Sequence, residues 1–306
     1  MEIGEYLDEL EDGSRKLRVA GLQRLSELNG EDRKVFDKRW PHIDVRRRRR
    51  LVQEIIDVAE DNVHLNFDSV FLRGLSDDDA EVRLESVRGL WEHESPGLIG
   101  TLAELLELDG DPAVRAEAAL ALGRYVLMFE TGRIRENQYQ RAEDALRKAV
   151  ENKNETEEVH ARAIEAIGAR DIPWVRQALR EAYESGEHRL KVSAVHAMGR
   201  SAENRWLPLL SRELASDEGE LRYEAAMATG QIGDETAIPQ LLPLLTDEDD
   251  DVREAATAAL GEIGGEHAKM ALMEMLDSSS TAAREAAAAA LAELEFEEDP
   301  LGFKFR

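Results

Sequence analysis

The sequence of 306 residues contains no cysteine. This absence excludes disulfides, thiolate nucleophiles and cysteine-ligated zinc or iron–sulfur sites. Aromatic residues make up only 5% of the chain, so a core must be built mainly from aliphatic side chains and alanine. No run approaches the roughly 18 consecutive apolar residues of a membrane helix, and the opening residues lack the pattern of a secretion signal. We therefore expect a cytoplasmic protein that does not bind membranes.

Lysine is also scarce, since it supplies only eight of the 39 basic residues, against 65 acidic ones. The formal net charge is −26. At molar salt the screening length falls to about 3 Å, so an excess of like charge becomes tolerable while it keeps the protein in solution. This composition is typical of a halophilic cytoplasm; an acidic protein from an ordinary cell is the alternative.

The negative charge is uneven along the chain. Residues 14–50 carry 13 basic residues and five acidic ones. They include the consecutive residues Arg46, Arg47, Arg48, Arg49 and Arg50. This cluster predicts a patch for an anionic partner, or else internal pairing with acids of the neighbouring repeats. Nucleic-acid binding is the least favoured interpretation, because the remainder of the chain would repel phosphates.

A short pattern recurs through the second half of the chain. A hydrophobic residue, a basic residue, an alanine four positions after the first and a glycine five positions later repeat at intervals of 31 residues. The first positions are Val159, Leu190, Leu221 and Val252, with a weaker copy at Ala283. Regular spacing of this length indicates stacked structural repeats in which each unit contacts its neighbours.

Each repeat is predicted to form two antiparallel helices, A and then B. In the repeat around Val252, the residues at +4, +7 and +8 complete one apolar helical face. The aspartates at 249–251 are candidate caps at the start of helix B, and Gly261 is a candidate left-handed cap at its end. Upstream, residues 237–245 predict a short helix A that Pro243 could kink.

Fainter copies extend the pattern toward the N-terminus, at Leu17, Val45, Val82 and Val114, which gives nine repeats. We expect one all-α solenoid, a right-handed superhelix over 1–306. Basic repeats occupy 1–65, middle repeats with an insertion occupy 66–156, regular repeats occupy 157–294, and a C-terminal cap occupies 295–306. The insertion, within 125–156, combines a longer helix B with a polar link, and its link is equally compatible with a binding role and with neutral drift.

The helix B sequence Asp-x-Val-Arg-x-x-Ala-x-x-Ala-Leu-Gly, at 250–261, resembles the HEAT-like repeat of phycobilin-lyase-related proteins. The resemblance covers roughly residues 14–294 and implies a helical solenoid. It also implies one alternative function, an enzyme subunit that handles a tetrapyrrole chromophore, although no chromophore-binding residue can be assigned.

The basic residue one position after each first residue has two interpretations. It is replaced only once, by His160. A ladder of anion-binding side chains is the functional interpretation. The favoured interpretation is structural, because an arginine at the same place in every stacked helix can hydrogen-bond carbonyls or acids of the adjacent loop.

No motif for catalysis, cofactor or metal is recognisable. The seven histidines include no two at helical spacing for a metal site. HEAT-repeat deoxyhypusine hydroxylases carry paired His-Glu ligands for iron at positions +2 and +3, where this sequence has pairs such as Ala116-Glu117 and Tyr223-Glu224. We therefore expect a protein without enzymatic activity, cofactor or metal.

Positions +2 and +6 of the B helices should lie opposite the core, where an idle surface would be polar. Several are instead apolar, aromatic or potential hydrogen-bonding residues. Such a stripe is typical of a partner groove, unless neighbouring helices cover it. Trp91, Trp174 and Trp206 are more simply explained as core residues. The candidate partner-binding residues are Leu84, Arg88, Leu120, Val192, His196, Tyr223 and Met227.

The sequence thus predicts a scaffold that holds a protein or peptide partner along the concave face formed by its B helices. The apolar members of the stripe would supply contact area, and Arg88 and His196 would orient the partner. A purely architectural array that holds no ligand is a further alternative.

Overall fold

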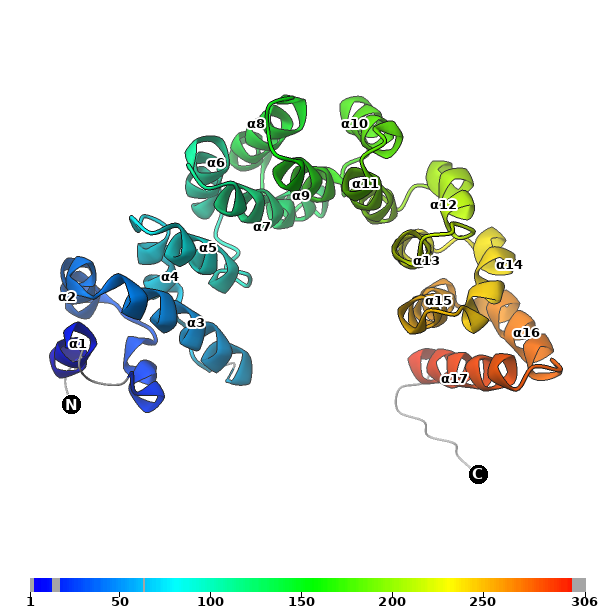
Figure 1. Cartoon of the computed structure of the whole chain (residues 1–306), viewed down its shortest axis with the longest axis horizontal. Helices are drawn as coiled ribbons and strands as arrows, with labels where there is room; N and C mark the ends of the chain where they lie inside the picture. Colours follow the sequence, from blue (N-terminus) through cyan, green and yellow to red (C-terminus); the bar gives the residue numbers. More distant parts are fainter. Residues whose placement is uncertain (1–2, 13–16, 63, 299–306) are drawn as a thin grey trace. The chain divides into compact units, whose positions relative to one another are not determined.

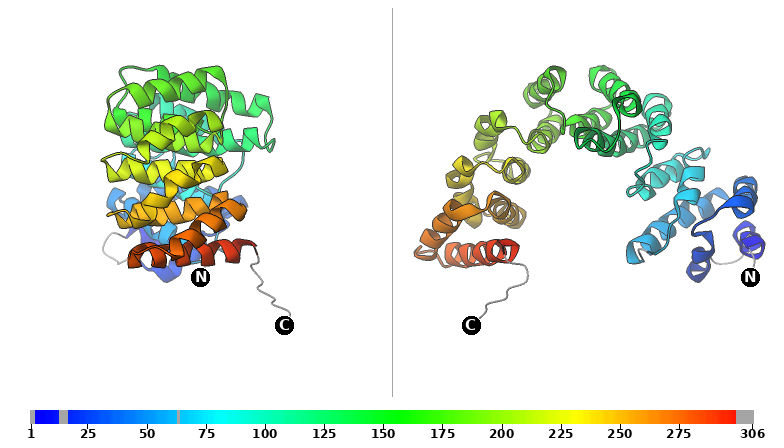
Figure 2. Two further views of the ribbon diagram at one scale, coloured as in Figure 1. Left: turned by 90° about the vertical axis from the view of Figure 1, so that its right-hand side faces the viewer. Right: turned by 180° about the vertical axis from the view of Figure 1, so that it is seen from behind.

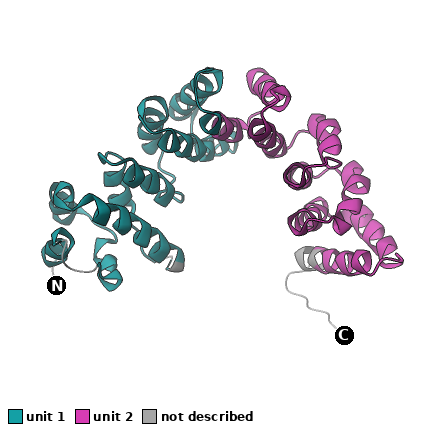
Figure 3. Cartoon of the chain, viewed as in Figure 1, with its two compact units in different colours: residues 1–159 teal, residues 160–306 magenta. Residues whose placement is uncertain are grey.

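The structure is a computed structural model that describes residues 3–12, 17–62 and 64–298, and these ranges contain only helices, turns and loops (Figure 1). The chain divides into two compact units, residues 1–159 and 160–306 (Figure 3). The boundary falls within helix α9, Glu157–Ile167.

The first unit alternates A and B helices from its start. Its A helices are α1 (Ile3–Glu11), α2 (Gly30–Arg39), α4 (Asp68–Gly74), α6 (Leu98–Leu108) and α8 (Glu136–Glu151). Its B elements are the 3-10 helix η1 (Val19–Leu25) and the α-helices α3 (Val45–Asp61), α5 (Ala80–Gly89) and α7 (Pro112–Glu130). Helix α3 packs against α5 and α5 against α7, so successive B helices form one layer.

The second unit repeats this arrangement more regularly. Its A helices are α10 (Pro173–Glu184), α12 (Leu207–Glu213), α14 (Ile238–Leu241) with the 3-10 helix η5 (Leu242–Thr246), and α16 (Gly265–Leu276). Its B helices are α11 (His188–Arg200), α13 (Gly219–Ile232), α15 (Asp250–Ile263) and α17 (Thr281–Glu298). Figure 2 shows the yellow, orange and red helices lying one above another, and each B helix packs against the next.

The predicted core face of the B helices is confirmed in α15, where Val252, Ala256, Ala259 and Leu260 are all 1% exposed or less. The N-cap is confirmed as well, since Asp249 accepts a hydrogen bond from the backbone N–H of Asp251 at 2.9 Å. Helix A of the same repeat changes from α to 3-10 geometry at Leu242. Sequence alone therefore located both helices and the interruption at Pro243.

The recurrent glycine follows the last residue of α9 at Gly168 but lies inside α11, α13 and α15, so the capping role predicted for Gly261 is wrong. Helix α15 continues to Ile263 and ends at Gly264. The equivalent Gly199 lies inside α11, and a Cβ there would come within 2.5 Å of the Cα of Ala228 in α13. Two further pairs repeat this contact, Gly168 with Ala197 and Gly230 with Ala259. The glycine is present because consecutive B helices approach too closely for a side chain.

The recurrent arginine joins five of the B helices to the loops around them, as the structural interpretation predicts. Arg222 donates from Nη1 to the carbonyl of Ser216 at 2.9 Å and forms a two-pronged pair with Asp247, both bonds 2.8 Å long. The bond from Nη1 to the carbonyl six positions earlier recurs at 2.7–2.9 Å in Arg83, Arg115, Arg253 and Arg284.

The first two repeats depart from the predicted register. The copy around Leu17 lies next to a 3-10 helix rather than an α-helix. In α3 the loop-binding arginine is Arg48, which donates to the Ile43 carbonyl at 2.9 Å, and not the predicted Arg46. The loop-binding arginine of α3 therefore lies two positions later than the pattern indicated.

The segment 125–156 contains the end of α7, a short link and α8. Helix α7 runs for 19 residues, and Tyr125 near its end covers the loop between α5 and α6, since its hydroxyl donates to the carbonyls of His93 and Ser95, both at 3.1 Å. Most of the predicted C-terminal cap, from 299 onward, lies outside the described residues.

Candidate partner-binding face

The four candidate residues of the second unit lie on one surface of its B layer. Val192 and His196 come from α11, and Tyr223 and Met227 from α13; all four are partly exposed. His196 is the polar member, with Nδ1 3.2 Å from a carboxylate oxygen of Glu224. Neighbouring helices therefore do not cover this part of the stripe completely.

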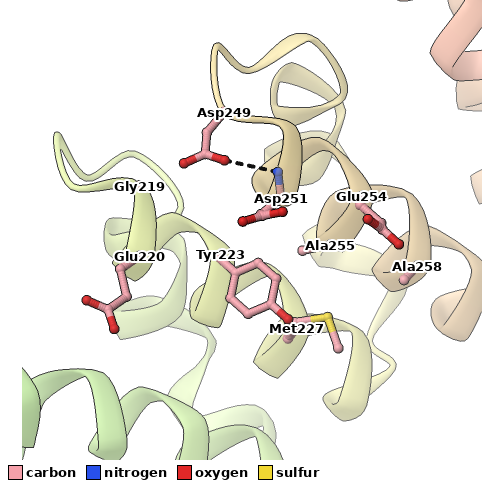
Figure 4. A pocket seen from close by; sticks show the side chains of 9 residues that line it. All are labelled: Gly219, Glu220, Tyr223, Met227, Asp249, Asp251, Glu254, Ala255 and Ala258. Carbon is pink, nitrogen blue, oxygen red and sulfur yellow. Dashed lines mark hydrogen bonds between the residues drawn. The ribbon is translucent and has the colours of Figure 1, made fainter.

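A groove between α13 and α15 brings two of these residues together. It has a volume of about 590 Å³, within the range of about 300–1,000 Å³ typical of ligand pockets. Figure 4 shows Tyr223 and Met227 on α13, with Ala255 and Ala258 on α15 across from them. The complete lining is Gly219, Glu220, Tyr223, Met227, Asp249, Asp251, Glu254, Ala255 and Ala258.

Four carboxylates surround this apolar centre, and no basic side chain contributes to the lining. Glu220 lies 2.8 Å from Nε2 of His188, and this hydrogen bond is the main reason that the pKa of His188 is raised. Asp249 is partly committed to capping α15. Within the described ranges, no ion pair is formed by Asp251 or Glu254. The groove is therefore strongly negative.

The candidate residues of the first unit differ from one another in exposure and in internal pairing. Leu84 is half-buried and Leu120 is 37% exposed, while Ala116, at the same helical position as Leu84, is buried. Arg88 forms ion pairs with Glu85 at 2.8 Å and Glu117 at 3.0 Å, so its guanidinium is held within the B layer. No groove comparable to that of the second unit is described around these three candidates.

Most of the arginine cluster is used internally. Arg47 donates to the Glu9 carbonyl at 2.7 Å, Arg48 lies 3.0 Å from Asp77, and Arg49 pairs with Asp79 at 2.6 Å. Arg50 pairs with Glu54 at 3.1 Å on its own helix, and Arg46 is exposed. The acids that pair with Arg48 and Arg49 come from the next repeat, which agrees with the pairing alternative, and this leaves little of a free anion-binding patch.

The sequence pattern did not reveal some residues that line the groove, nor some apolar residues that are exposed elsewhere. Asp251, Glu254 and Ala258 of α15 all line the groove, although none of them is among the candidate residues. Trp206 is buried as predicted, whereas Trp91 is 62% exposed, so its assignment to the core is wrong. The largest exposed apolar groups besides Trp91 are Leu108, Met270, Met273 and Leu127. Their helical positions fall outside the +2/+6 rule, so the stripe could not reveal them.

Among the residues that the structure describes, no helix is long and apolar enough to cross a bilayer. No three histidine, aspartate or glutamate side chains in these ranges converge as a metal site.

A protein-family model described as HEAT repeats matches residues 69–153 and 207–292, together more than half of the chain. The chain belongs to the HEAT-repeat family. No curated protein matches this HEAT-repeat sequence.

Solved structures support the HEAT-repeat solenoid. One is the complex of CpcE and CpcF of phycocyanin lyase from Nostoc sp. PCC7120, with 16% identity, a TM-score of 0.52, and coverage of 92% of this chain and 97% of that one. At this identity the similarity shows the fold alone. Human deoxyhypusine hydroxylase is similar over 96% of each chain, with 21% identity and a TM-score of 0.34. An engineered protein is similar over 96% of this chain and 88% of its own, with 18% identity and a TM-score of 0.42.

Proposed function

We propose that this HEAT-repeat protein is a non-catalytic scaffold that binds a protein or peptide partner on the exposed face of its B helices. The observation that carries the proposal is the groove between α13 and α15, where an aromatic ring and a methionine lie partly exposed between two helices. Aromatic residues and methionine are enriched in interface cores, because they offer a large contact area.

The partner contacts in the second unit are Tyr223 and Met227 at the centre, with Val192 and His196 on the adjacent helix. Leu84, Arg88 and Leu120 form a secondary contact set in the first unit. The proposal includes a cytoplasmic location, and the excess of acidic residues favours a cytoplasm of high salt.

Paired variants test the function. Tyr223→Glu with Met227→Glu places two charges in the groove. Met270→Glu with Met273→Glu is the matched control, because these methionines are 55% and 53% exposed on α16, an A helix. Affinity purification from native extract at native salt, with mass spectrometry, identifies partners, and titration of the main partner measures affinity.

We expect the groove variant to lose at least about 2 kcal/mol of binding free energy, roughly thirtyfold in affinity, and the control to bind normally. An unchanged set of partners with the groove variant would refute this use of the B-helix face. Equal losses in both variants would indicate a general effect of added charge instead.

The second candidate is an enzyme subunit that handles a chromophore, supported by the backbone similarity to phycocyanin lyase. This candidate function has less support than the scaffold, because no residue of this chain can be matched to chromophore binding. Visible absorbance that co-purifies with the native protein and persists through gel filtration would favour this candidate over the scaffold.

A further inference from the structure

The groove between α13 and α15 differs in charge balance from the other two grooves described. One of these, beside α6 and α8, contains Glu107, Glu155 and Lys148. Glu107 pairs there with Lys148 at 2.8 Å, and Glu155 pairs with Arg115 at 2.6 Å. Charge within that groove is therefore largely compensated inside the protein.

The other groove, on α3, has three arginines and three acids in its lining, Arg46, Arg49, Arg50, Glu54, Asp57 and Glu81. Its positive and negative charges balance. General acidity of the protein thus does not explain the α13–α15 groove, whose lining holds four carboxylates and no basic residue.

The net negative charge of the α13–α15 groove can be estimated from its four carboxylates and the positive charges near them. Two helix N-termini, of α13 and α15, each contribute about half a positive charge. A protonated His188 beside Glu220 would contribute one more. Roughly two negative charges then remain, and they belong mainly to Asp251 and Glu254, for which no internal cation is described.

The groove also has a direction and a length. It extends along α13 from Gly219 to Met227. Eight residues at 1.5 Å each give about 12 Å, which matches about four residues of extended chain at roughly 3.3 Å each. Tyr223 lies in the middle of this length, where its ring is partly exposed and can receive a cationic side chain.

We propose that this groove binds an extended basic segment of the partner, with an arginine or lysine side chain placed against Tyr223 and paired with Asp251 and Glu254. This inference rests on the proposed scaffold function and adds the chemistry of the bound segment. Charge complementarity selects the segment, while Met227, Ala255 and Ala258 contact the aliphatic part of the basic side chain.

Labelled peptides provide the test. A six-residue peptide of alternating arginine and serine is compared with peptides in which glutamine or glutamate replaces arginine, using fluorescence anisotropy at low and at molar salt. The variant Asp251→Asn with Glu254→Gln neutralises the groove. Glu274→Gln with Asp277→Asn is the matched control, since both are exposed acids at the end of α16.

We expect the arginine peptide to bind and the other two not to. Neutralising the groove should weaken binding about tenfold, because each partly exposed ion pair is worth up to about 1 kcal/mol. The control should leave binding unchanged. Tyr223→Leu should weaken binding about threefold, and this loss should persist at molar salt, where screening reduces the other contributions.

A charge reversal provides an independent variant. Asp251→Lys with Glu254→Lys should lose the arginine peptide and gain the glutamate peptide. Equal weakening by the groove and control variants would overturn the proposal, because it would show attraction to the net charge alone. Binding of spermidine as tight as that of the peptide would also overturn it.

The outcomes separate the two proposals. In one outcome, the Tyr223 and Met227 substitutions abolish the binding of native partners while the Asp251 and Glu254 substitutions leave the affinity for the arginine peptide unchanged. In that case the scaffold function stands and the basic segment is refuted. If native partners ignore Tyr223 and Met227, both proposals fail. Circular dichroism of each variant confirms that the helices are retained.

Discussion

The stabilisation from the recurrent arginine should depend on how deeply its acidic partner is buried, and two neighbouring repeats allow a direct comparison. Arg222 and Asp247 have side chains only 10% and 9% exposed. Arg253 occupies the same helical position in the next repeat, but its partner Asp250 is 87% exposed. Both arginines also donate to a loop carbonyl, so the exposure of the ion pair is the main difference between them.

Arg222→Ala leaves the carboxylate of Asp247 nearly buried without its cation, which costs about 3 kcal/mol. Arg253→Ala loses an exposed pair worth at most about 1 kcal/mol and a carbonyl bond of similar value. The free energy of unfolding should therefore fall by about 1–2 kcal/mol more in the first variant. Both substitutions remove one positive charge, so their effects on the net charge of −26 cancel in the comparison.

Urea unfolding followed by circular dichroism, at one fixed salt concentration, measures the difference. Arg222 also holds the pKa of Asp247 below its usual 3.8. Stability from a lowered carboxyl pKa is present above the unfolded pKa and is lost as pH falls through the folded one. The gap between the variants should accordingly narrow as the pH falls below 3.8 and through the lowered pKa of Asp247.

Equal destabilisation by both substitutions at neutral pH would refute this reasoning. It would mean that the carbonyl bond, common to both, supplies the stabilisation, and that the buried pair adds nothing. A gap that stays constant in acid would refute the role of the Asp247 carboxylate specifically.

Other perturbations test packing, a buried charge and a histidine. Gly199→Ala should lower the free energy of unfolding by about 1–3 kcal/mol, because its Cβ would meet the next helix. Gly100→Ala, where a Cβ would have nothing within 4 Å, should raise it by about 0.5–1 kcal/mol. Urea midpoints compare the two variants, and a stabilised Gly199→Ala would contradict the packing argument. Lys191→Met should cost about 3 kcal/mol in calorimetry, since it leaves Glu213, 2% exposed, without the ammonium 2.8 Å away, and an unchanged melting temperature would argue against this pair. The raised pKa of His188 means that its stabilisation is fully present below pH 6.5 and is lost as pH rises through the raised value. Urea midpoints of the wild type and His188→Gln should therefore converge at alkaline pH, and a constant difference would show that the charge of the ring is not involved.

The sequence predicted the helices and their core faces well, because both follow from local periodicity. Val252 and its partners are buried as the helical spacing requires, and Asp249 caps as its position suggests. The function of Gly261 was misjudged because a glycine after an apolar run has the same local pattern whether it ends a helix or admits a neighbour. Only the contact of Gly199 with Ala228, 29 positions away, separates these roles.

The sequence predicted only some of the residues that line the groove. Tyr223 and Met227 could be identified because they occupy helical positions that should be polar on an idle surface. Asp251 and Glu254 could not, since in a chain with 65 acids a carboxylate carries little information by itself. What distinguishes them is the lack of a described internal cation, and ion pairing between residues far apart in sequence is decided by three-dimensional packing.

The close contact between consecutive B helices has a consequence for how such a chain can change length. Three glycines of the second unit, Gly168, Gly199 and Gly230, each face the Cα of an alanine on the next B helix, and each alanine lies 29 positions later in the sequence. Loss of residues 190–220, one full period, would bring Gly168 opposite Ala228 and recreate an existing type of junction. Gain or loss of whole 31-residue modules by unequal recombination therefore preserves the fit between these helices.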